Sequence, residues 1–134
     1  MKKIDVIIER ADEGTYSAYC VDEQFSGMGD TPEAAKKDLE SQIHVYREYC
    51  KEERVEYPSW LDQDYELVIQ FDTESLLQYY AGIITPAALE RLTGINRKQL
   101  WSYMHGRSKP RKAQINRIAS ALHRLGEELV TLSI

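Results

Sequence analysis

Residues 85–106 read TPAALERLTGINRKQLWSYMHG and contain two short helical patterns on either side of a sharp turn. Thr85 followed by Pro86 is typical of a helix start, with an N-cap hydroxyl and Pro at the first helical position. Gly94 can adopt the left-handed backbone conformation that ends this helix, which a side chain would resist. Asn96 can cap the next helix. The stretch therefore predicts two short helices separated by a tight turn.

The second of these helices has two chemically different faces. Its apolar face, which we expect to be buried, consists of Leu100, Tyr103 and Met104. Its polar face has the spacing i, i+3, i+4 and i+7 and consists of Lys98, Trp101, Ser102 and His105. Positive charge, hydrogen-bond donors and an apolar group for a thymine methyl are what a helix in the DNA major groove requires. We also expect Gln99 to reach back to Asn96 and complete a capping box.

Basic residues follow this helix and lead into a last one. The segment around Pro110 is rich in Lys and Arg, and the apolar spacing after it predicts a helix that ends at Gly126. The inward positions of that helix are Ile115, Ile118, Ala119, Leu122 and Leu125. The candidate DNA-contacting residues are Asn96, Arg97, Lys98, Trp101, Ser102, His105, Arg107, Lys109, Arg111 and Lys112. We expect the four from Arg97 to Ser102 to read bases, and those from His105 onward mostly to hold phosphates.

The two halves of the chain carry opposite charge. Between Arg91 and Arg124 there are nine Lys or Arg residues and no Asp or Glu. Residues 1–75 have eight basic and nineteen acidic residues, a formal net charge of −11, whereas residues 76–134 have nine and three, a net charge of +6. A basic surface suits a polyanion, because each phosphate that it neutralises releases condensed counterions. The acidic half is better matched to a basic protein or to solvent.

The first half predicts three strands, a long helix and a fourth strand. Alternating Ile4, Val6 and Ile8 indicate the first strand, and residues 15–21 and 24–28 indicate the next two. The helix begins at Thr31-Pro32, again a cap followed by Pro, and its inner stripe is Ala35, Leu39, Ile43, Tyr46 and Cys50. Residues 65–71 read as the fourth strand. A short helix from Asp72 or Thr73 to Gly82 then begins the second half.

Catalysis, a cofactor and a membrane location find little support in the sequence. Cys20 and Cys50 form no CxxC pair, the three His residues lack metal-ligand spacing, and we expect no metal and no cofactor. The chain has no GxSxG, no Walker-type glycine loop and no GxGxxG. No run approaches the roughly 18–20 consecutive apolar residues of a membrane span, and the first residues lack a signal-peptide core. We expect a cytoplasmic protein that is not an enzyme.

Two parts of the chain resemble known families. Similarity to the Xre/Cro-like helix-turn-helix domains lies in residues 88–95, ALERLTGI, followed by Leu100, Tyr103, Gly106, Pro110, Ile118, Ala119, Ala121 and Leu122. Similarity to the HicB antitoxin domain lies in residues 9–19, ERADEGTYSAY, followed by residues 29–35, GDTPEAA. Their order matches the HicB subgroup that ends in a helix-turn-helix. The chain departs from these families at Glu90, where many members have Ala, at Pro86, where many have Gln, and at residues 21–27, where a Pro-Gly-Cys-like turn is common.

The resemblance implies an α+β protein with two domains. Residues 1–72 would form a partial RNase H-like β-β-β-α-β domain that binds a toxin, and residues 73–134 an all-α helix-turn-helix domain that binds DNA. The implied partners are a HicA-like toxin, which is a small basic RNA-cleaving protein, and the operator DNA of a shared operon that the protein represses. The candidate toxin-binding residues are Asp12, Glu13, Asp22 and Glu23.

The last residues predict a short C-terminal strand, because Val130, Leu132 and Ile134 alternate with three other residues. A lone strand must pair, either with the sheet of the first domain or with its copy in a second chain. The second pairing would give a two-fold dimer suited to a palindromic DNA site with half-sites about 34 Å apart. We expect a homodimer or a homotetramer.

Two other functions stay open. The chain could be a stand-alone transcriptional repressor, whose acidic half senses something else or only dimerises. A nuclease, which RNase H-like ancestry would suggest, is disfavoured: it needs carboxylates that converge on Mg²⁺. The carboxylates in question, which fit solvated strand edges equally well, are Asp5, Glu9, Asp22 and Asp72.

Overall fold

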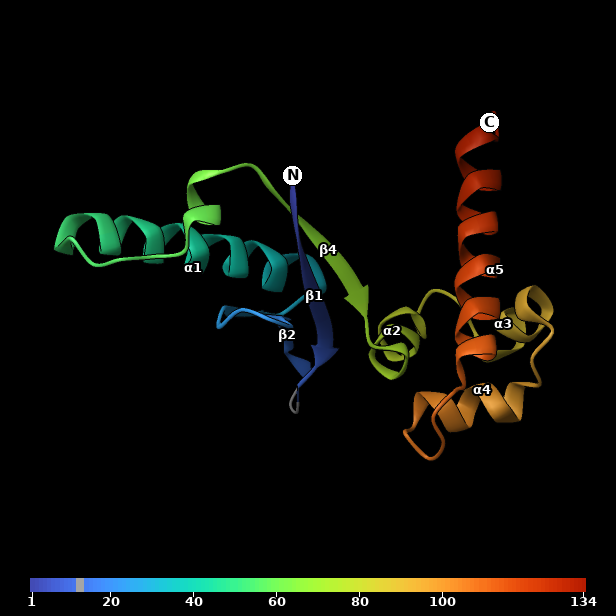
Figure 1. Ribbon diagram of the computed structural model, residues 1–134. Helices are drawn as coiled ribbons and strands as arrows, with labels where there is room; N and C mark the ends of the chain where they lie inside the picture. Colours follow the sequence, from blue (N-terminus) through green and yellow to red (C-terminus); the bar gives the residue numbers. More distant parts are fainter. Residues whose placement is uncertain (12–13) are drawn as a thin grey trace. The chain divides into compact units, whose positions relative to one another are not determined.

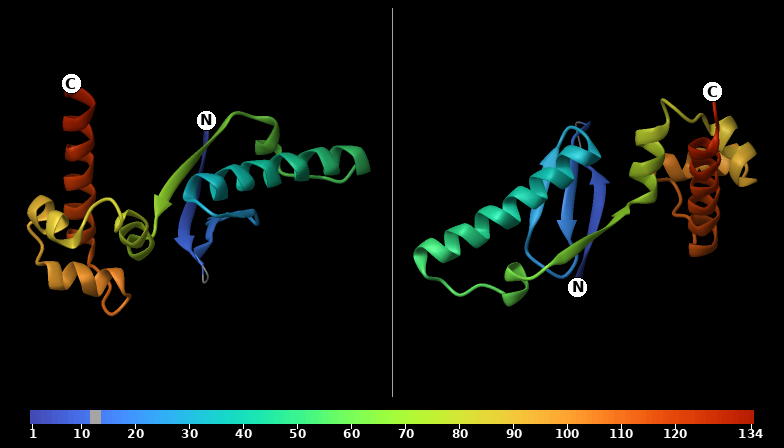
Figure 2. Two further views of the ribbon diagram at one scale, coloured as in Figure 1. Left: turned by 180° about the vertical axis from the view of Figure 1, so that it is seen from behind. Right: turned by 90° about the horizontal axis from the view of Figure 1, so that it is seen from above.

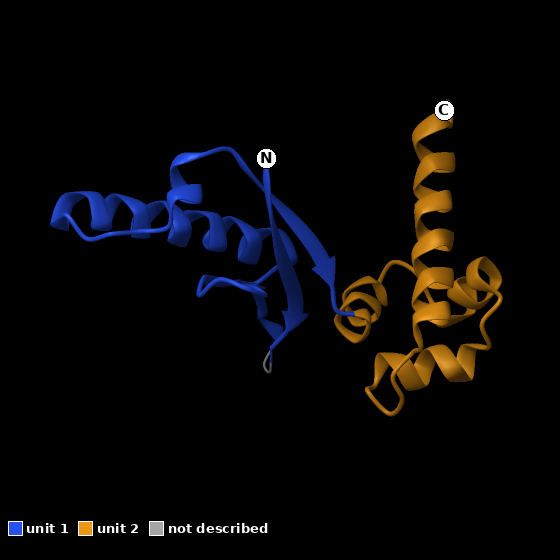
Figure 3. Cartoon of the chain, viewed as in Figure 1, with its two compact units in different colours: residues 1–72 blue, residues 73–134 orange. Residues whose placement is uncertain are grey.

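The computed structural model describes residues 1–11 and 14–134 and divides into two compact units, Met1–Asp72 and Thr73–Ile134 (Figure 3). Asp12 and Glu13, two of the predicted toxin-binding residues, lie outside the described residues. The architecture is α+β, with a β-β-β-α-β mixed sheet followed by four helices. In the described residues, none of the helices is both long enough and apolar enough to cross a membrane.

A four-stranded mixed sheet forms the scaffold of the first unit (Figure 1). Its strands, in the spatial order β3-β2-β1-β4, are β1 (Lys2–Arg10), β2 (Tyr16–Cys20), β3 (Ser26–Gly29) and β4 (Tyr65–Phe71). Ile8 lies opposite Ala18 of antiparallel β2 and opposite Phe71 of parallel β4. The predicted order of elements is confirmed, and the alternating Ile4, Val6 and Ile8 are all buried as predicted.

The helix α1 (Pro32–Glu53) lies across one face of this sheet (Figure 2). Thr31 caps it as predicted, since its Oγ1 accepts the backbone N–H of Ala34 at 3.0 Å. The inner stripe is confirmed at Ala35, Leu39, Ile43 and Cys50. The prediction was wrong for Tyr46, which is 38% exposed, because its ring packs edge-on against Phe25 at 5.3 Å and not under the sheet.

A short 3-10 helix, η2 (Ser59–Asp62), connects α1 to β4 and was not predicted. It places Trp60 and Leu61 in the core of the first unit, where they are 6% and 5% exposed. Arg47 of α1 holds this segment through Asp62, with Nη2 and Oδ1 2.8 Å apart. Hydrogen bonds from Arg47 and Tyr57 lower the pKa of Asp62.

Two glycines allow β3 to lie directly against α1. A Cβ on Gly27 would lie 2.3 Å from the backbone N of Leu39, and one on Gly29 would lie 2.7 Å from the backbone N of Ala35. Any side chain at these positions would push the helix away from the sheet. The outward N–H of Met28, between them, donates to the Asp38 carboxylate of α1 at 2.9 Å. The sheet and α1 therefore form one closely packed body.

The second unit consists of four helices around its own core (Figure 1). They are α2 (Thr73–Tyr80), α3 (Pro86–Thr93), α4 (Arg97–Met104) and α5 (Lys112–Thr131). The buried core residues are Leu77, Leu89, Ile95, Leu100, Tyr103, Met104 and Ile118. The predicted burial of one face of α4 is thus confirmed.

The end of the chain differs from the prediction. The helix α5 does not end at Gly126 but continues to Thr131, and residues 132–134 follow it without forming a strand. A glycine inside a helix costs only about 1 kcal/mol relative to Ala, so Gly126 does not by itself end the helix. The predicted C-terminal strand was wrong, and so was the inward position of Ile115, which is 40% exposed.

Candidate functional site

The turn between α3 and α4 has the predicted caps. Thr85 Oγ1 accepts the N–H of Ala88 at 3.1 Å, and Asn96 Oδ1 accepts the N–H of Lys98 at 2.8 Å. Gly94 ends α3 with φ +75°. The predicted capping box was wrong, because the Gln99 amide donates to Ser108 Oγ at 3.1 Å and not to the backbone of Asn96.

Glu90 of α3 is bound to the first residue of α4. Its Oε2 accepts the backbone N–H of Arg97 at 2.6 Å, and its Oε1 accepts Nε and Nη2 of the Arg97 guanidinium at 3.2 and 3.0 Å. The backbone N–H of Arg97, and then its side chain, lower the pKa of Glu90. The Arg97 side chain is still 59% exposed. Glu90 therefore holds an exposed cation in a defined position at the start of α4.

The exposed face of α4 is centred on Trp101, which is 44% exposed. His105 stacks on its ring, with the centroids 4.1 Å apart and the planes at 26°, and its Nδ1 donates a hydrogen bond of 2.8 Å to the Trp101 carbonyl. The Arg107 guanidinium lies over the same indole, 5.2 Å from the ring centroid. One aromatic ring thus holds two nitrogen-rich side chains against the surface of α4.

The basic loop after α4 is fixed along the helix by Ser108. Its Oγ accepts from Gln99 and lies 2.7 Å from Ser102 Oγ. Ser102, a predicted base reader, is therefore only half-exposed and its hydroxyl has a partner within the protein. The other predicted residues are exposed, and on the loop and at the start of α5 they are Arg107, Lys109, Arg111 and Lys112. Of these four, Arg107 is the residue with a contact to α4, through the Trp101 ring.

A shallow apolar hollow of about 440 Å³ lies beside Trp101. Its lining residues are Pro86, Arg97, Lys98 and Trp101. Pro86 was noted as a departure from the Xre/Cro-like pattern but was not among the candidate DNA-contacting residues. Arg117 was also missed, and its role is structural, because its Nη2 donates to the Thr93 carbonyl at 3.1 Å and so ties α5 to the end of α3.

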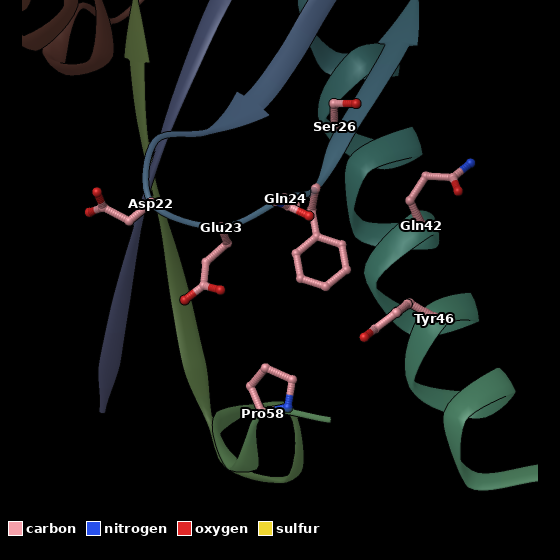
Figure 4. Close-up of a pocket in the computed structure, with 8 residues that line it drawn as sticks. Asp22, Glu23, Gln24, Ser26, Gln42, Tyr46 and Pro58 are labelled. Carbon is pink, nitrogen blue, oxygen red and sulfur yellow. The ribbon is translucent and has the colours of Figure 1, made fainter. Parts of the chain in front are cut away.

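The first unit contains a separate groove of about 510 Å³ (Figure 4). It lies between the segment that joins β2 to β3, the outer side of α1 and Pro58. Its lining residues are Asp22, Glu23, Gln24, Phe25, Ser26, Gln42, Tyr46 and Pro58. Two predicted toxin-binding residues, Asp22 and Glu23, therefore lie on the rim of a groove with an aromatic wall. The aromatic wall could not be predicted from the sequence, because Phe25 and Tyr46 come from segments far apart in the chain.

The aromatic wall continues into the core of the first unit. Phe25 contacts Tyr46 and Trp60, with ring centroids 5.3 and 6.1 Å apart, and Trp60 contacts Tyr65 at 5.1 Å. Lys2 Nζ lies 5.9 Å from the centroid of the Trp60 ring and 4.0 Å from the Glu23 carboxylate, at the limit of an ion pair. Asp22 is exposed.

The carboxylates considered for a nuclease were Asp5, Glu9, Asp22 and Asp72. In the described part of the chain, no three His, Cys, Asp or Glu side chains gather as a metal ion would require. Cys20 and Cys50 are buried and free, as predicted, and burial raises the pKa of the Cys20 thiol.

Comparisons of the chain with protein-family models, with curated proteins and with solved structures each returned no match.

Proposed function

We propose that this chain is an antitoxin of the HicB type, whose second unit represses its own operon and whose first unit neutralises a HicA-like toxin. The observation that carries the DNA-binding part is the exposed cationic and aromatic surface of α4, where Lys98, Trp101, His105 and Arg107 lie together. Such a surface compensates phosphate charge and offers an apolar contact to base edges. The resemblance to Xre/Cro-like domains supports the same role.

In this proposal α3 and α4 form a helix-turn-helix, and α4 enters the major groove. Arg97 and Lys98 donate to guanine edges from the N-terminal end of the helix. The hollow between Pro86 and Trp101 accepts a thymine methyl, which is the apolar feature of the major groove. The cations from Arg107 to Lys112 contact phosphates and fix the register of the protein on the duplex.

The first unit, for which we infer a partial RNase H-like fold, is the toxin-binding part. It has eight basic and eighteen acidic residues, a formal net charge of −10, which attracts a basic protein over distance. The groove supplies the specific contact. An Arg or Lys of the toxin would reach the Asp22 and Glu23 carboxylates while its stem or guanidinium packs on the rings of Phe25 and Tyr46.

The DNA-binding part is tested by selection from random duplexes with the full chain, followed by footprinting of the enriched sequence. The proposal expects a palindrome with two protected half-sites about 34 Å apart on one side of the duplex. Failure to enrich any sequence over the starting pool would contradict it.

The toxin-binding part is tested by co-expression with the product of the neighbouring reading frame. The proposal expects co-purification of a basic ribonuclease and rescue of growth. The double variant Asp22→Lys, Glu23→Lys should lose both, while the matched double variant Glu52→Lys, Glu53→Lys, at exposed positions on α1, should keep both. If operator binding is found but no protein co-purifies, the stand-alone repressor is the correct description.

A further inference from the structure

The last turns of α5 leave the core of the second unit. Ile118 and Ala121 are each 3% exposed, whereas every residue from Gly126 to Thr131 is exposed. In Figures 1 and 2 this part of α5 extends past α3 and α4. The last six residues of α5, 126–131, therefore extend beyond the part of the helix that packs on the unit.

An apolar stripe continues into these exposed turns. It consists of Ile115, Ile118, Leu122, Leu125 and Leu129, at alternating intervals of three and four residues, and Leu132, directly after the last helical residue, adds a further apolar side chain. Ile118 and Leu122 pack in the core, but Leu129 and Leu132 are 57% and 64% exposed. This alternation is the pattern by which one helix packs lengthwise against another.

Local propensity does not explain why the extension is helical. Gly126 is unfavourable inside a helix by about 1 kcal/mol, and nothing lies within 4 Å of the Cβ that another residue would place there. Glu127 and Glu128 lie near the C-terminal end, where the helix dipole disfavours negative charge. Short helices without packing are marginal in water. A partner on the apolar stripe would supply the missing stabilisation.

We propose that the stripe packs against the same stripe of a second copy of this chain, as an antiparallel helix pair about a two-fold axis near Glu127. Leu125 then meets the partner subunit's Leu129, and Leu122 meets the partner subunit's Leu132. Such a contact is isologous and closes as a dimer. The inference goes beyond the proposed function, because it concerns assembly in the absence of DNA and of toxin.

The charged residues beside the stripe favour a second copy of the chain as the partner and an antiparallel orientation of the two helices. Arg124 and Glu128 flank the same edge of the stripe, one turn apart. In an antiparallel pair this edge meets its own copy, so that Arg124 lies near the partner subunit's Glu128, and the pair occurs twice. In a parallel pair the edge would meet the uncharged edge that carries Gly126. The antiparallel pair also brings the two Gly126 residues near the axis, where the missing side chain permits close backbone approach.

Sedimentation equilibrium of the full chain without DNA tests the inference. The wild type should have twice the 15.5 kDa mass of one chain. The double variant Leu129→Asp, Leu132→Asp should have the single-chain mass, and it does not disturb the chain's own core, since both side chains are exposed. Val130→Asp is the matched control, because Val130 is 85% exposed on the same helix but off the stripe, and it should keep the dimer mass.

Charge exchange tests the antiparallel direction. Arg124→Glu and Glu128→Arg should each weaken association several-fold, and the two together should restore it. The proposed dimer contact would be overturned if the wild type had the single-chain mass at all soluble concentrations, or if the double Asp variant remained a dimer. A charge-exchanged double variant weaker than either single variant would overturn the antiparallel arrangement. None of these outcomes depends on whether the chain binds DNA.

Discussion

The carboxylate of Glu90 joins α3 to α4 by receiving both the backbone N–H and the guanidinium of Arg97, with Oε2 2.6 Å from the N and Oε1 3.0 Å from Nη2. One side chain thus fixes the geometry of the turn and the position of the first cation on α4. Many helix-turn-helix domains have a small Ala at this place, where the helices touch. Here a longer side chain lies at the margin of the contact, half-buried, and pairs with the cation beside it.

This contact should make stability depend on acid pH. The pKa of Glu90 is lowered from its ordinary 4.5 by hydrogen bonds from Arg97, so its stabilising effect is present above the unfolded pKa and is lost as the pH falls through the folded value. We predict that Glu90→Gln lowers the Tm at neutral pH but has no effect at a pH below the folded pKa, where both side chains are neutral. Thermal unfolding across this range measures it, with Glu127→Gln as the control. An equal Tm loss at every pH would contradict the prediction.

Arg97→Ala should reduce the preference for operator over scrambled DNA more than it reduces DNA binding in general. Because the guanidinium is held in place and 59% exposed, we expect it to read a base. Its removal should reduce the difference in binding free energy between operator and scrambled DNA by about 1–3 kcal/mol. Fluorescence anisotropy at one fixed salt concentration provides the comparison. If the preference for operator over scrambled DNA did not change, Arg97 would serve only to hold the turn through Glu90 and would not read a base.

Lys112→Ala should behave differently. Lys112 is exposed at the first position of α5, in the segment expected to hold phosphates. Its loss should weaken binding to operator and scrambled DNA alike and reduce the slope of log K against log salt by about 1. Lys37→Ala, an exposed cation on α1, is the control and should leave the slope unchanged. If Lys112→Ala weakened binding to operator more than binding to scrambled DNA, Lys112 would be a residue that reads bases and not one that holds phosphate.

Gly27→Ala should destabilise the first unit. The added Cβ would lie 2.3 Å from the backbone N of Leu39, so β3 or α1 must move. Overpacking of this kind costs about 1–3 kcal/mol. Denaturant unfolding measures the loss, and Gly82→Ala, with nothing within 4 Å of its Cβ, should be close to neutral. Equal stability of the two variants would mean that the close packing of β3 on α1 does not matter for folding.

The features that were predictable are those that depend on neighbours in sequence. The caps at Thr31 and Thr85, the turn at Gly94 and the alternation in β1 follow from local stereochemistry, and all are confirmed. The groove could not be predicted, because Phe25 and Tyr46 meet only after α1 has packed on the sheet. Gly126 gave the wrong helix end, since a single glycine weakens a helix without stopping it.

On the candidate DNA surface, sequence periodicity identified the exposed face of α4 but not its internal bonds. Helical spacing alone placed Ser102 beside Trp101 on the outside. The loop that follows α4 brings Ser108 next to this helix, where its hydroxyl forms a hydrogen bond with the Ser102 hydroxyl. Such a loop position depends on tertiary packing, which spacing within one helix does not contain.

The most direct test of the proposed function is the affinity of wild type and Trp101→Ala for the selected operator and for a scrambled duplex at one salt concentration. Ile83→Ala, at a 76% exposed apolar position in the same unit, is the control. The wild type and the control should prefer the operator by about 10³-fold or more. Trp101→Ala, which removes the ring that carries His105 and Arg107, should lose at least about tenfold in operator affinity, or 1.4 kcal/mol, with little change on scrambled DNA. Operator affinity equal to that of wild type would contradict the claim that this face of α4 reads DNA.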